Sequence, residues 1–132
     1  MSKILIVEDD ALLSRMYHQA FLSAGHEVLT ATDGEDGLAK AVKESPDIIL
    51  LDIMMPKISG LQVLDKLKSN PTIKKTPVVI LTNLSDEKKA EEALSLGAIK
   101  YLVKSDYKPK QVLQIVTDLI SGSQRKEIPN VT

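Results

Sequence analysis

The chain has 132 residues, no cysteine, and 17 lysine and arginine residues against 18 aspartate and glutamate residues, for a net charge of -1. This length accommodates about one domain, the missing thiols exclude a disulfide framework or a thiolate metal site, and the balanced charge gives no general attraction to nucleic acid or anionic lipid. The first apolar run, residues 4–7, is too short for a signal peptide or a membrane span. We therefore expect a cytoplasmic protein that binds neither nucleic acid directly nor membranes.

Five aliphatic segments predict β-strands, at residues 4–7, 27–31, 48–51, 78–81 and 99–103. The runs at 4–7 and 48–51 show no alternation of apolar and polar residues, which is typical of strands covered on both faces. Pro56 follows the central run closely and cannot continue a central strand, so Asp52 is expected at the carboxyl end of that strand.

Apolar residues at helical spacing predict a helix after each strand. In chain order, the apolar faces of these helices are Leu13, Met16, Tyr17, Ala20, Phe21 and Ala24; then Leu38, Ala41 and Val42; then Leu61, Leu64 and Leu67; then Ala90, Ala93 and Leu94; and finally Val112, Leu113, Val116, Leu119 and Ile120. Asp33 and Gly34 are expected to form a turn, Ser85 or Asp86 to cap the fourth helix, and Gly97 to end it.

Five strands that each lead into a helix predict an α/β fold, a doubly wound parallel five-stranded sheet with right-handed crossovers and helices on both faces. One domain is expected over residues 1–122. Residues 123–132 are polar and contain Pro129, so they are expected to form a flexible C-terminal tail.

A parallel sheet brings the carboxyl ends of its strands to one edge. The polar residues expected there are Glu8, Asp9, Asp52, Thr82 and Lys104. Three carboxylates at one edge repel each other unless a cation or shared protons offset the charge, and ligands that offer only oxygen favour Mg²⁺ or Mn²⁺. A hydroxyl and an ammonium group beside such an ion suit an incoming phosphoryl group, with a carboxylate as its nucleophile.

Four segments carry a resemblance to a known family: residues 3–10, residues 49–56 together with Gly60, residues 79–82 and residues 101–104. In this order and spacing, over about residues 2–121, the sequence resembles the receiver domain of two-component response regulators, such as the chemotaxis regulators. The resemblance implies a flavodoxin-like (βα)5 fold with strand order 2-1-3-4-5.

The resemblance also implies a role for each acid. Asp52 would accept a phosphoryl group from a sensor histidine kinase, from a phosphotransfer protein or from a small phosphodonor, which makes an aspartyl phosphate. Asp9, Asp52 and the backbone carbonyl of Met54 would bind Mg²⁺ directly, and Glu8 would bind it through water. These assignments define a magnesium-dependent phosphoacceptor.

On the other side of the phosphoryl group, the resemblance implies that Lys104 pairs with its oxygens and that Thr82 donates a hydrogen bond to one of them. Tyr101 would turn inward when Thr82 moves, although a tyrosine in a strand is also a common packing residue. The signal would reach an unknown downstream protein through the face formed by the helix after Asp86, the strand at 99–103 and the helix after Pro109.

The sequence departs from the family pattern at two places. Ser105 stands where the family usually has a proline in a cis peptide, and because a cis bond before another residue costs about 2.5 to 4 kcal/mol, we expect a trans peptide. Asn83 replaces a small residue, and it either narrows access for the phosphodonor or hydrogen-bonds the phosphoryl group. Since Met54 and Leu84 are apolar, we hypothesise that dephosphorylation is altered.

These features favour a stand-alone response regulator that is not a turnover enzyme, although it could phosphorylate and dephosphorylate itself. Two alternatives remain open. One is a receiver-like scaffold that no longer accepts phosphate, and the other is a Mg²⁺-dependent phosphohydrolase with Asp52 as the nucleophile. Against the phosphohydrolase, Met54 stands where an aspartate could have served as general acid and base.

Overall fold

The computed structural model describes residues 2–125 of the chain. The elements follow one another as β1 (Lys3–Val7), α1 (Ala11–Ser23), β2 (Glu27–Ala31), α2 (Gly34–Glu44), β3 (Ile48–Leu51), α3 (Gly60–Ser69), β4 (Val78–Thr82), α4 (Glu87–Ser95), β5 (Lys100–Val103), the 3₁₀ helix η1 (Lys104–Asp106) and α5 (Pro109–Arg125). All strand pairs are parallel, in the order β2-β1-β3-β4-β5, which confirms the predicted fold.

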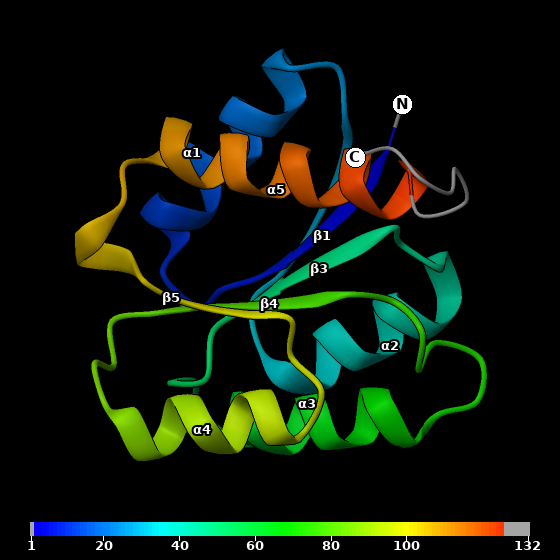
Figure 1. Cartoon of the computed structure of the whole chain (residues 1–132), viewed down its shortest axis with the longest axis vertical. Coiled ribbons are helices and arrows are strands. Elements are labelled where there is room, and N and C mark those ends of the chain that lie inside the picture. The colour runs from blue at the N-terminus through cyan, green and yellow to red at the C-terminus, as the bar shows by residue number, and fades with distance from the viewer. Residues whose placement is uncertain (1, 126–132) are drawn as a thin grey trace.

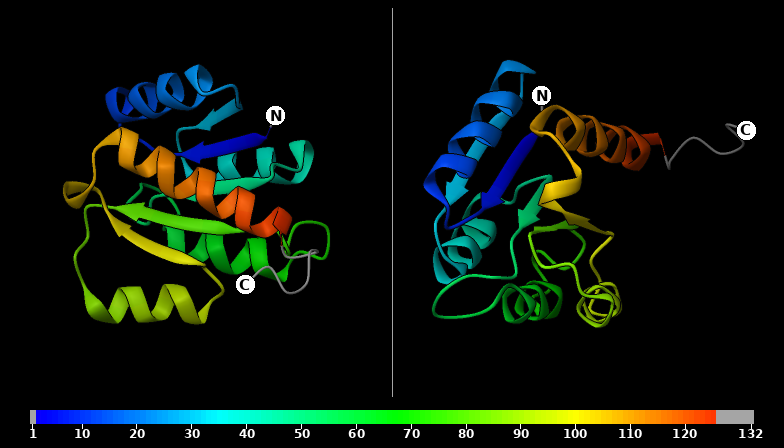
Figure 2. Two further views of the ribbon diagram at one scale, coloured as in Figure 1. Left: turned by 45° about the horizontal axis from the view of Figure 1, so that its top comes forward. Right: turned by 90° about the vertical axis from the view of Figure 1, so that its left-hand side faces the viewer.

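The sheet forms the middle of three layers. Figure 1 shows α1 and α5 on one face and α2, α3 and α4 on the other, and Figure 2 shows the same layers from two further directions. Alternate residues of a buried strand therefore serve different cores: in β1, Ile4 and Ile6 pack under α1 and α5, whereas Leu5 and Val7 pack against the opposite helices. Both faces are apolar for this reason, which explains the unbroken aliphatic runs.

The register of the sheet places the polar residues that follow the strands at one level. Val7 of β1 is paired with Leu51 of β3, so Glu8 and Asp52 leave adjacent strands side by side. The backbone N–H of Asp52 donates to the carbonyl of Val7 at 3.1 Å, which extends the pairing by one step. The fold therefore delivers the carboxylates of two central strands to the same edge.

The prediction of a turn at Asp33 and Gly34 was wrong in its details. Asp33 is the N-cap of α2, where its carboxylate accepts a hydrogen bond from the backbone N–H of Asp36 at 2.8 Å, and Gly34 is the first residue of the helix. An aspartate serves turns and helix caps through the same acceptor chemistry, so sequence alone does not separate the two.

The predicted inward position of Leu94 was also wrong, as was the predicted start of the last strand at Ile99. The side chain of Leu94 is 48% exposed and that of Ile99 is 44% exposed, and β5 begins at Lys100. In α4 only Ala93 is buried, and the helix packs beside β5, the strand at the edge of the sheet. A helix of this kind leaves some apolar residues at the surface.

The last helix, α5, continues to Arg125, past the domain boundary expected at residue 122. The rest of the predicted tail, residues 126–132, lies outside the described residues. Between residues 2 and 125, none of the helices has both the length and the apolar character needed to cross a membrane.

Candidate functional site

A hollow of about 250 Å³ lies at the carboxyl edge of the sheet. It is lined by Glu8, Asp9, Asp10, Leu13, Asp52, Met54, Asn83 and Lys104. These residues follow β1, β3, β4 and β5 or belong to the first turn of α1, so the sheet alone brings them together. The structure thus gathers most of the polar residues predicted for this edge.

Three charged side chains form a buried cluster at the floor of this hollow. Glu8 is 3% exposed, Asp52 is 5% exposed and Lys104 is 9% exposed. The Lys104 ammonium lies 2.9 Å from Oδ2 of Asp52 and forms a second ion pair with Oε1 of Glu8. Lys104 therefore supplies, within the protein, part of the positive charge that the clustered carboxylates require.

Burial and charge act on this cluster in opposite directions. For Lys104, burial disfavours the charged ammonium, but the hydrogen bonds to Asp52 and Glu8 and the negative charge of both acids together outweigh burial and raise its pKa above the ordinary value of 10.5. For Glu8, burial outweighs the hydrogen bond from Lys104, so its pKa is raised above 4.5. Two carboxylates thus share one ammonium group, and the excess negative charge is available to a further cation.

A backbone hydrogen bond from the β3–α3 loop holds the Asp52 carboxylate in place. Its Oδ1 accepts a hydrogen bond from the backbone N–H of Met54 at 2.9 Å, which leaves Oδ2 for Lys104. Gly60, the first residue of α3, packs closely against the backbone of Asp52. A Cβ added at Gly60 would lie 2.2 Å from the carbonyl oxygen of Asp52. Only glycine permits this approach, which holds the β3–α3 loop against the acid.

The donor set at this site fits a hard divalent cation. Glu8, Asp9 and Asp52 each offer a carboxylate oxygen, and these oxygens lie within 4.8 Å of one another. Asp9 is exposed while Glu8 and Asp52 are buried, so the three acids form a site that is open to solvent on the side of Asp9. Carboxylate oxygens in this arrangement suit Mg²⁺, which retains several waters when it binds to proteins.

Thr82 and Tyr101 are not among the residues that line the hollow, and both are hydrogen-bonded to the backbone of one residue, Leu84. Thr82 is fully buried, and its Oγ1 accepts a hydrogen bond from the backbone N–H of Leu84 at 3.3 Å. The carbonyl oxygen of Leu84 in turn accepts a hydrogen bond from the hydroxyl of half-buried Tyr101 at 2.5 Å. The backbone of Leu84 therefore links the two predicted switch residues.

Sequence reasoning missed some parts of the site. Asp10 lines the hollow and caps α1 by accepting hydrogen bonds from the backbone N–H groups of Leu12 and Leu13, and its own N–H donates to Glu8 at 3.0 Å. An acid just before an apolar helical pattern is a recognisable cap signal. No sequence signal could have shown that the backbone N–H and carbonyl of Leu84 link Thr82 to Tyr101, because every residue except proline offers the same backbone groups.

The segment after Lys104 differs from the usual family pattern, as predicted. The peptide between Lys104 and Ser105 is trans, and Lys104 to Asp106 form the 3₁₀ helix η1. The backbone N–H of Tyr107 donates to the carbonyl of Lys104 at 3.2 Å, and the Tyr107 side chain packs into the core under α1 and α5. A single tight turn thus follows Lys104 and leads into the start of α5.

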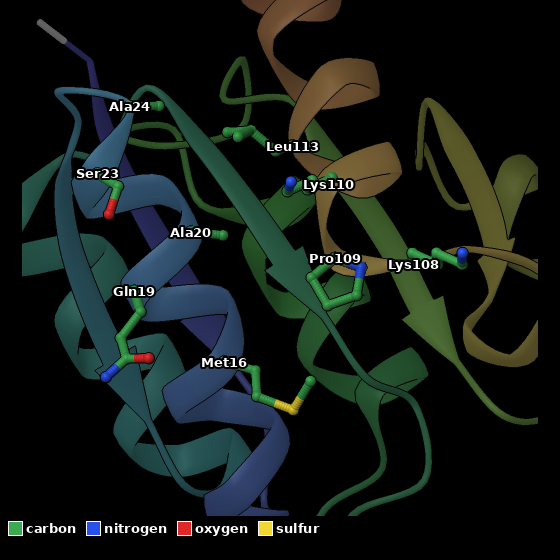
Figure 3. A pocket seen from close by; sticks show the side chains of 9 residues that line it. All are labelled: Met16, Gln19, Ala20, Ser23, Ala24, Lys108, Pro109, Lys110 and Leu113. Carbon is green, nitrogen blue, oxygen red and sulfur yellow. The ribbon is translucent and has the colours of Figure 1, made fainter.

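A second hollow, of about 870 Å³, lies between α1 and the start of α5, away from the acids (Figure 3). It is lined by Met16, Gln19, Ala20, Ser23, Ala24, Lys108, Pro109, Lys110 and Leu113. This groove is larger than the acidic hollow, but it contains no carboxylate and only two lysines. We therefore take the smaller hollow as the functional site, since it is the one that brings reactive and charged groups together.

The three-layer fold and its strand order are those of the flavodoxin-like class of α/β domains. A family profile described as the response regulator receiver domain matches residues 4–117, and the chain belongs to this family. Receiver domains are signalling domains of two-component systems rather than classical enzymes, they interact with histidine kinases or phosphotransfer proteins, and phosphorylation on an aspartate is general among them.

Similarity to individual proteins agrees with this family. The chemotaxis protein CheY4 of Vibrio cholerae has a TM-score of 0.83 and 33% identity, over 89% of this chain and 98% of that protein. The transcriptional regulatory protein PhoP of Bacillus subtilis is 34% identical over 92% of this chain and 50% of its own length. The response regulator ArlR of Staphylococcus aureus is 34% identical over 99% of this chain and 58% of its own length. The chain therefore spans about half the length of these two curated relatives.

Proposed function

We propose that this chain is a receiver that accepts a phosphoryl group on Asp52 from a histidine kinase or a phosphotransfer protein. The observation that carries the proposal is the position of Asp52. It is buried against Lys104, which also pairs with Glu8, and its carboxylate lies within 4.8 Å of oxygens of Glu8 and the exposed Asp9 in the acidic hollow. This is the arrangement needed to balance charge on a transferred phosphoryl group.

In the proposed reaction, one carboxylate oxygen of Asp52 forms a bond to phosphorus while the bond from phosphorus to the donor atom breaks, and the electron pair leaves with the donor. Asp9, Asp52 and the Met54 carbonyl would hold Mg²⁺ directly and Glu8 through water, and the bound ion would offset charge on the phosphoryl oxygens. The Lys104 ammonium already donates a hydrogen bond to the Asp52 carboxylate. In the proposed reaction it donates to a phosphoryl oxygen instead.

The signal is proposed to travel along the Thr82–Leu84–Tyr101 chain of hydrogen bonds. When the Thr82 hydroxyl turns to a phosphoryl oxygen, the backbone N–H of Leu84 loses its acceptor. The carbonyl of the same residue holds Tyr101, so a shift of the β4–α4 loop reaches the surface formed by α4, β5 and α5. Phosphorylation then favours one loop arrangement over another by differential hydrogen bonding.

That the receiver acts as a stand-alone protein, with contacts to a downstream protein as its output, is part of this proposal. Output through protein contacts suits this domain, because its net charge of -1 gives it no general attraction to DNA.

The test is phosphorylation with acetyl phosphate and Mg²⁺, followed by intact mass. We expect the wild type to gain one phosphoryl group, and Asp52→Ala to gain none. Asp65→Ala, which removes an exposed aspartate of α3, serves as the matched control and should behave as the wild type. Full phosphorylation of Asp52→Ala would refute the assignment, and removal of Mg²⁺ with a chelator should suppress the reaction in the wild type.

A further inference from the structure

The acidic hollow contains a polar side chain, Asn83, to which the proposed reaction assigns no role. Its lining comprises four acids, one lysine, the apolar side chains of Leu13 and Met54, and Asn83. Asn83 directly follows Thr82 at the end of β4 and is exposed. Among the residues that line this hollow in the described part of the chain, its carboxamide is the only uncharged side chain with N–H donors.

The charges around Asp52 show why such a donor matters. The lining carries four carboxylates against the single ammonium of Lys104, which is already shared between Asp52 and Glu8. A phosphoryl group on Asp52 adds further negative charge to this surface. A neutral N–H donor stabilises phosphoryl oxygens without drawing Lys104 away from Glu8, and a hydrogen bond to a charged acceptor is stronger than one between neutral groups.

The opposite side of the hollow offers no substitute for this donor. Met54 is 55% exposed and presents a thioether, which donates no hydrogen bond. Thr82 is buried and is not among the residues that line the hollow, so the phosphoryl oxygen to which its hydroxyl turns is one that points inward. A phosphoryl oxygen that faces the mouth of the hollow, away from Lys104, therefore has Asn83 as its side-chain donor.

We propose that the side-chain amide of Asn83 donates a hydrogen bond to the phosphoryl group on Asp52 and so stabilises the phosphorylated receiver. This inference rests on the proposed function and assigns a further binding residue to the same site. The sequence leaves two roles open for Asn83. Its side chain either acts as a gate, whose size limits access of the phosphodonor, or as a partner, which donates a hydrogen bond to the phosphoryl group. A gate acts through size, whereas a partner acts through its N–H group.

The experiment measures the affinity of beryllofluoride, a non-covalent analogue of the phosphoryl group, by fluorine NMR in the presence of Mg²⁺. Three variants remove the donor in different ways: Asn83→Ala is smaller, Asn83→Leu is bulky and apolar, and Asn83→Asp keeps the size but adds charge. We expect Asn83→Ala and Asn83→Leu to bind about tenfold more weakly than the wild type, which corresponds to about 1.4 kcal/mol, and Asn83→Asp to bind more weakly still.

A second readout is the half-life of the aspartyl phosphate, which the loss of this hydrogen bond should shorten in Asn83→Ala. Asn70→Ala is the matched control, because Asn70 caps the far end of α3 and lines a different surface. It should bind beryllofluoride with wild-type affinity, and thermal unfolding of each variant confirms that the fold is retained.

Unchanged or tighter binding by Asn83→Ala would overturn the inference, and weaker binding by Asn83→Leu alone would identify a gate instead. Equal weakening in Asn70→Ala would show that the effect is not specific to the hollow, which also overturns it. Failure of the wild type to bind, or binding by Asp52→Ala at wild-type affinity, would overturn the proposed function and this inference together. Loss of the Asn83 effect alone leaves the proposed function standing.

Discussion

Two walls of the hollow are held by different kinds of interaction. On one wall, Glu8, Asp52 and Lys104 are buried charges in direct contact. The second wall lies behind the lining residues, where Thr82 and Tyr101 are joined through the backbone N–H and carbonyl of Leu84 by hydrogen bonds between neutral groups. Breaking a buried ion pair costs about 3–5 kcal/mol, whereas a neutral hydrogen bond contributes about 1 kcal/mol. The charged wall is therefore suited to hold a reaction site in place, and the neutral wall to rearrange when a ligand binds.

The largest effect is expected from Lys104→Met, which leaves Glu8 and Asp52 buried without their ammonium partner. We expect a loss of about 3–5 kcal/mol in the free energy of unfolding, measured with urea at pH 7. Added Mg²⁺ should restore more stability to this variant than to the wild type, because the cation then replaces the missing charge. A loss below about 1 kcal/mol would mean that the two walls do not differ in the way described.

The same variant gives a pH test of the charged wall. The pKa of Lys104 in the folded protein lies above its ordinary value of 10.5, so its stabilising effect is fully present below pH 10.5 and is lost as the pH rises through the folded-state pKa. The difference in stability between the wild type and Lys104→Met should therefore narrow in that high range. A difference that stays constant up to strongly alkaline pH would contradict the assigned ion pairs.

Gly60→Ala tests whether the charged wall depends on the backbone beneath it. The added Cβ would lie 2.2 Å from the carbonyl oxygen of Asp52 and 2.4 Å from Cα of Ile53, and neither backbone atom can move without displacing the end of β3. We expect a destabilisation of about 3 kcal/mol by urea unfolding. Gly122→Ala is the control, since a Cβ at Gly122 meets nothing within 4 Å.

Tyr101→Phe probes the neutral wall. It removes the hydrogen bond to the Leu84 carbonyl while the half-buried ring is kept, so the free energy of unfolding should fall by about 1 kcal/mol. We expect this loss in the free energy of unfolding to be clearly smaller than the loss caused by Lys104→Met under the same conditions. Tyr107→Phe is a control on the neighbouring segment, and equal losses in both variants would show that the Leu84 contact has no particular weight.

The smallest effect is expected from Asp33→Asn, at an exposed ion pair with Lys57 whose charged atoms lie 3.4 Å apart. The backbone N–H of Asp36, helped by Lys57, lowers the pKa of Asp33 below its ordinary value of 3.8. Its charge therefore stabilises the fold above pH 3.8, and this effect is lost as the pH falls through the lower folded-state pKa. Thermal unfolding should show a slight advantage of the wild type at pH 7 that disappears in acid.

Much of the fold follows from local sequence patterns. The unbroken aliphatic runs at β1, β3 and β4 are buried on both faces, and the acids and polar groups that end them lie at one edge of the sheet. The apolar pattern did not predict burial near the end of α4 and before β5. Leu94 and Ile99 belong to apolar stretches there, yet both are about half exposed. A hydrophobic pattern identifies an element, but neighbouring elements decide how much of it is covered.

By itself, the sequence determined which chemical groups meet at the carboxyl edge, because five parallel strands bring the residues that follow them to the same edge of the sheet. Only the tertiary structure decided how these groups are paired. Lys104 contacts both Glu8 and Asp52, and Thr82 accepts a hydrogen bond from the backbone N–H of Leu84 behind the hollow. Such pairings depend on register, on burial and on backbone atoms that every residue shares, and none of these is encoded by residue type alone.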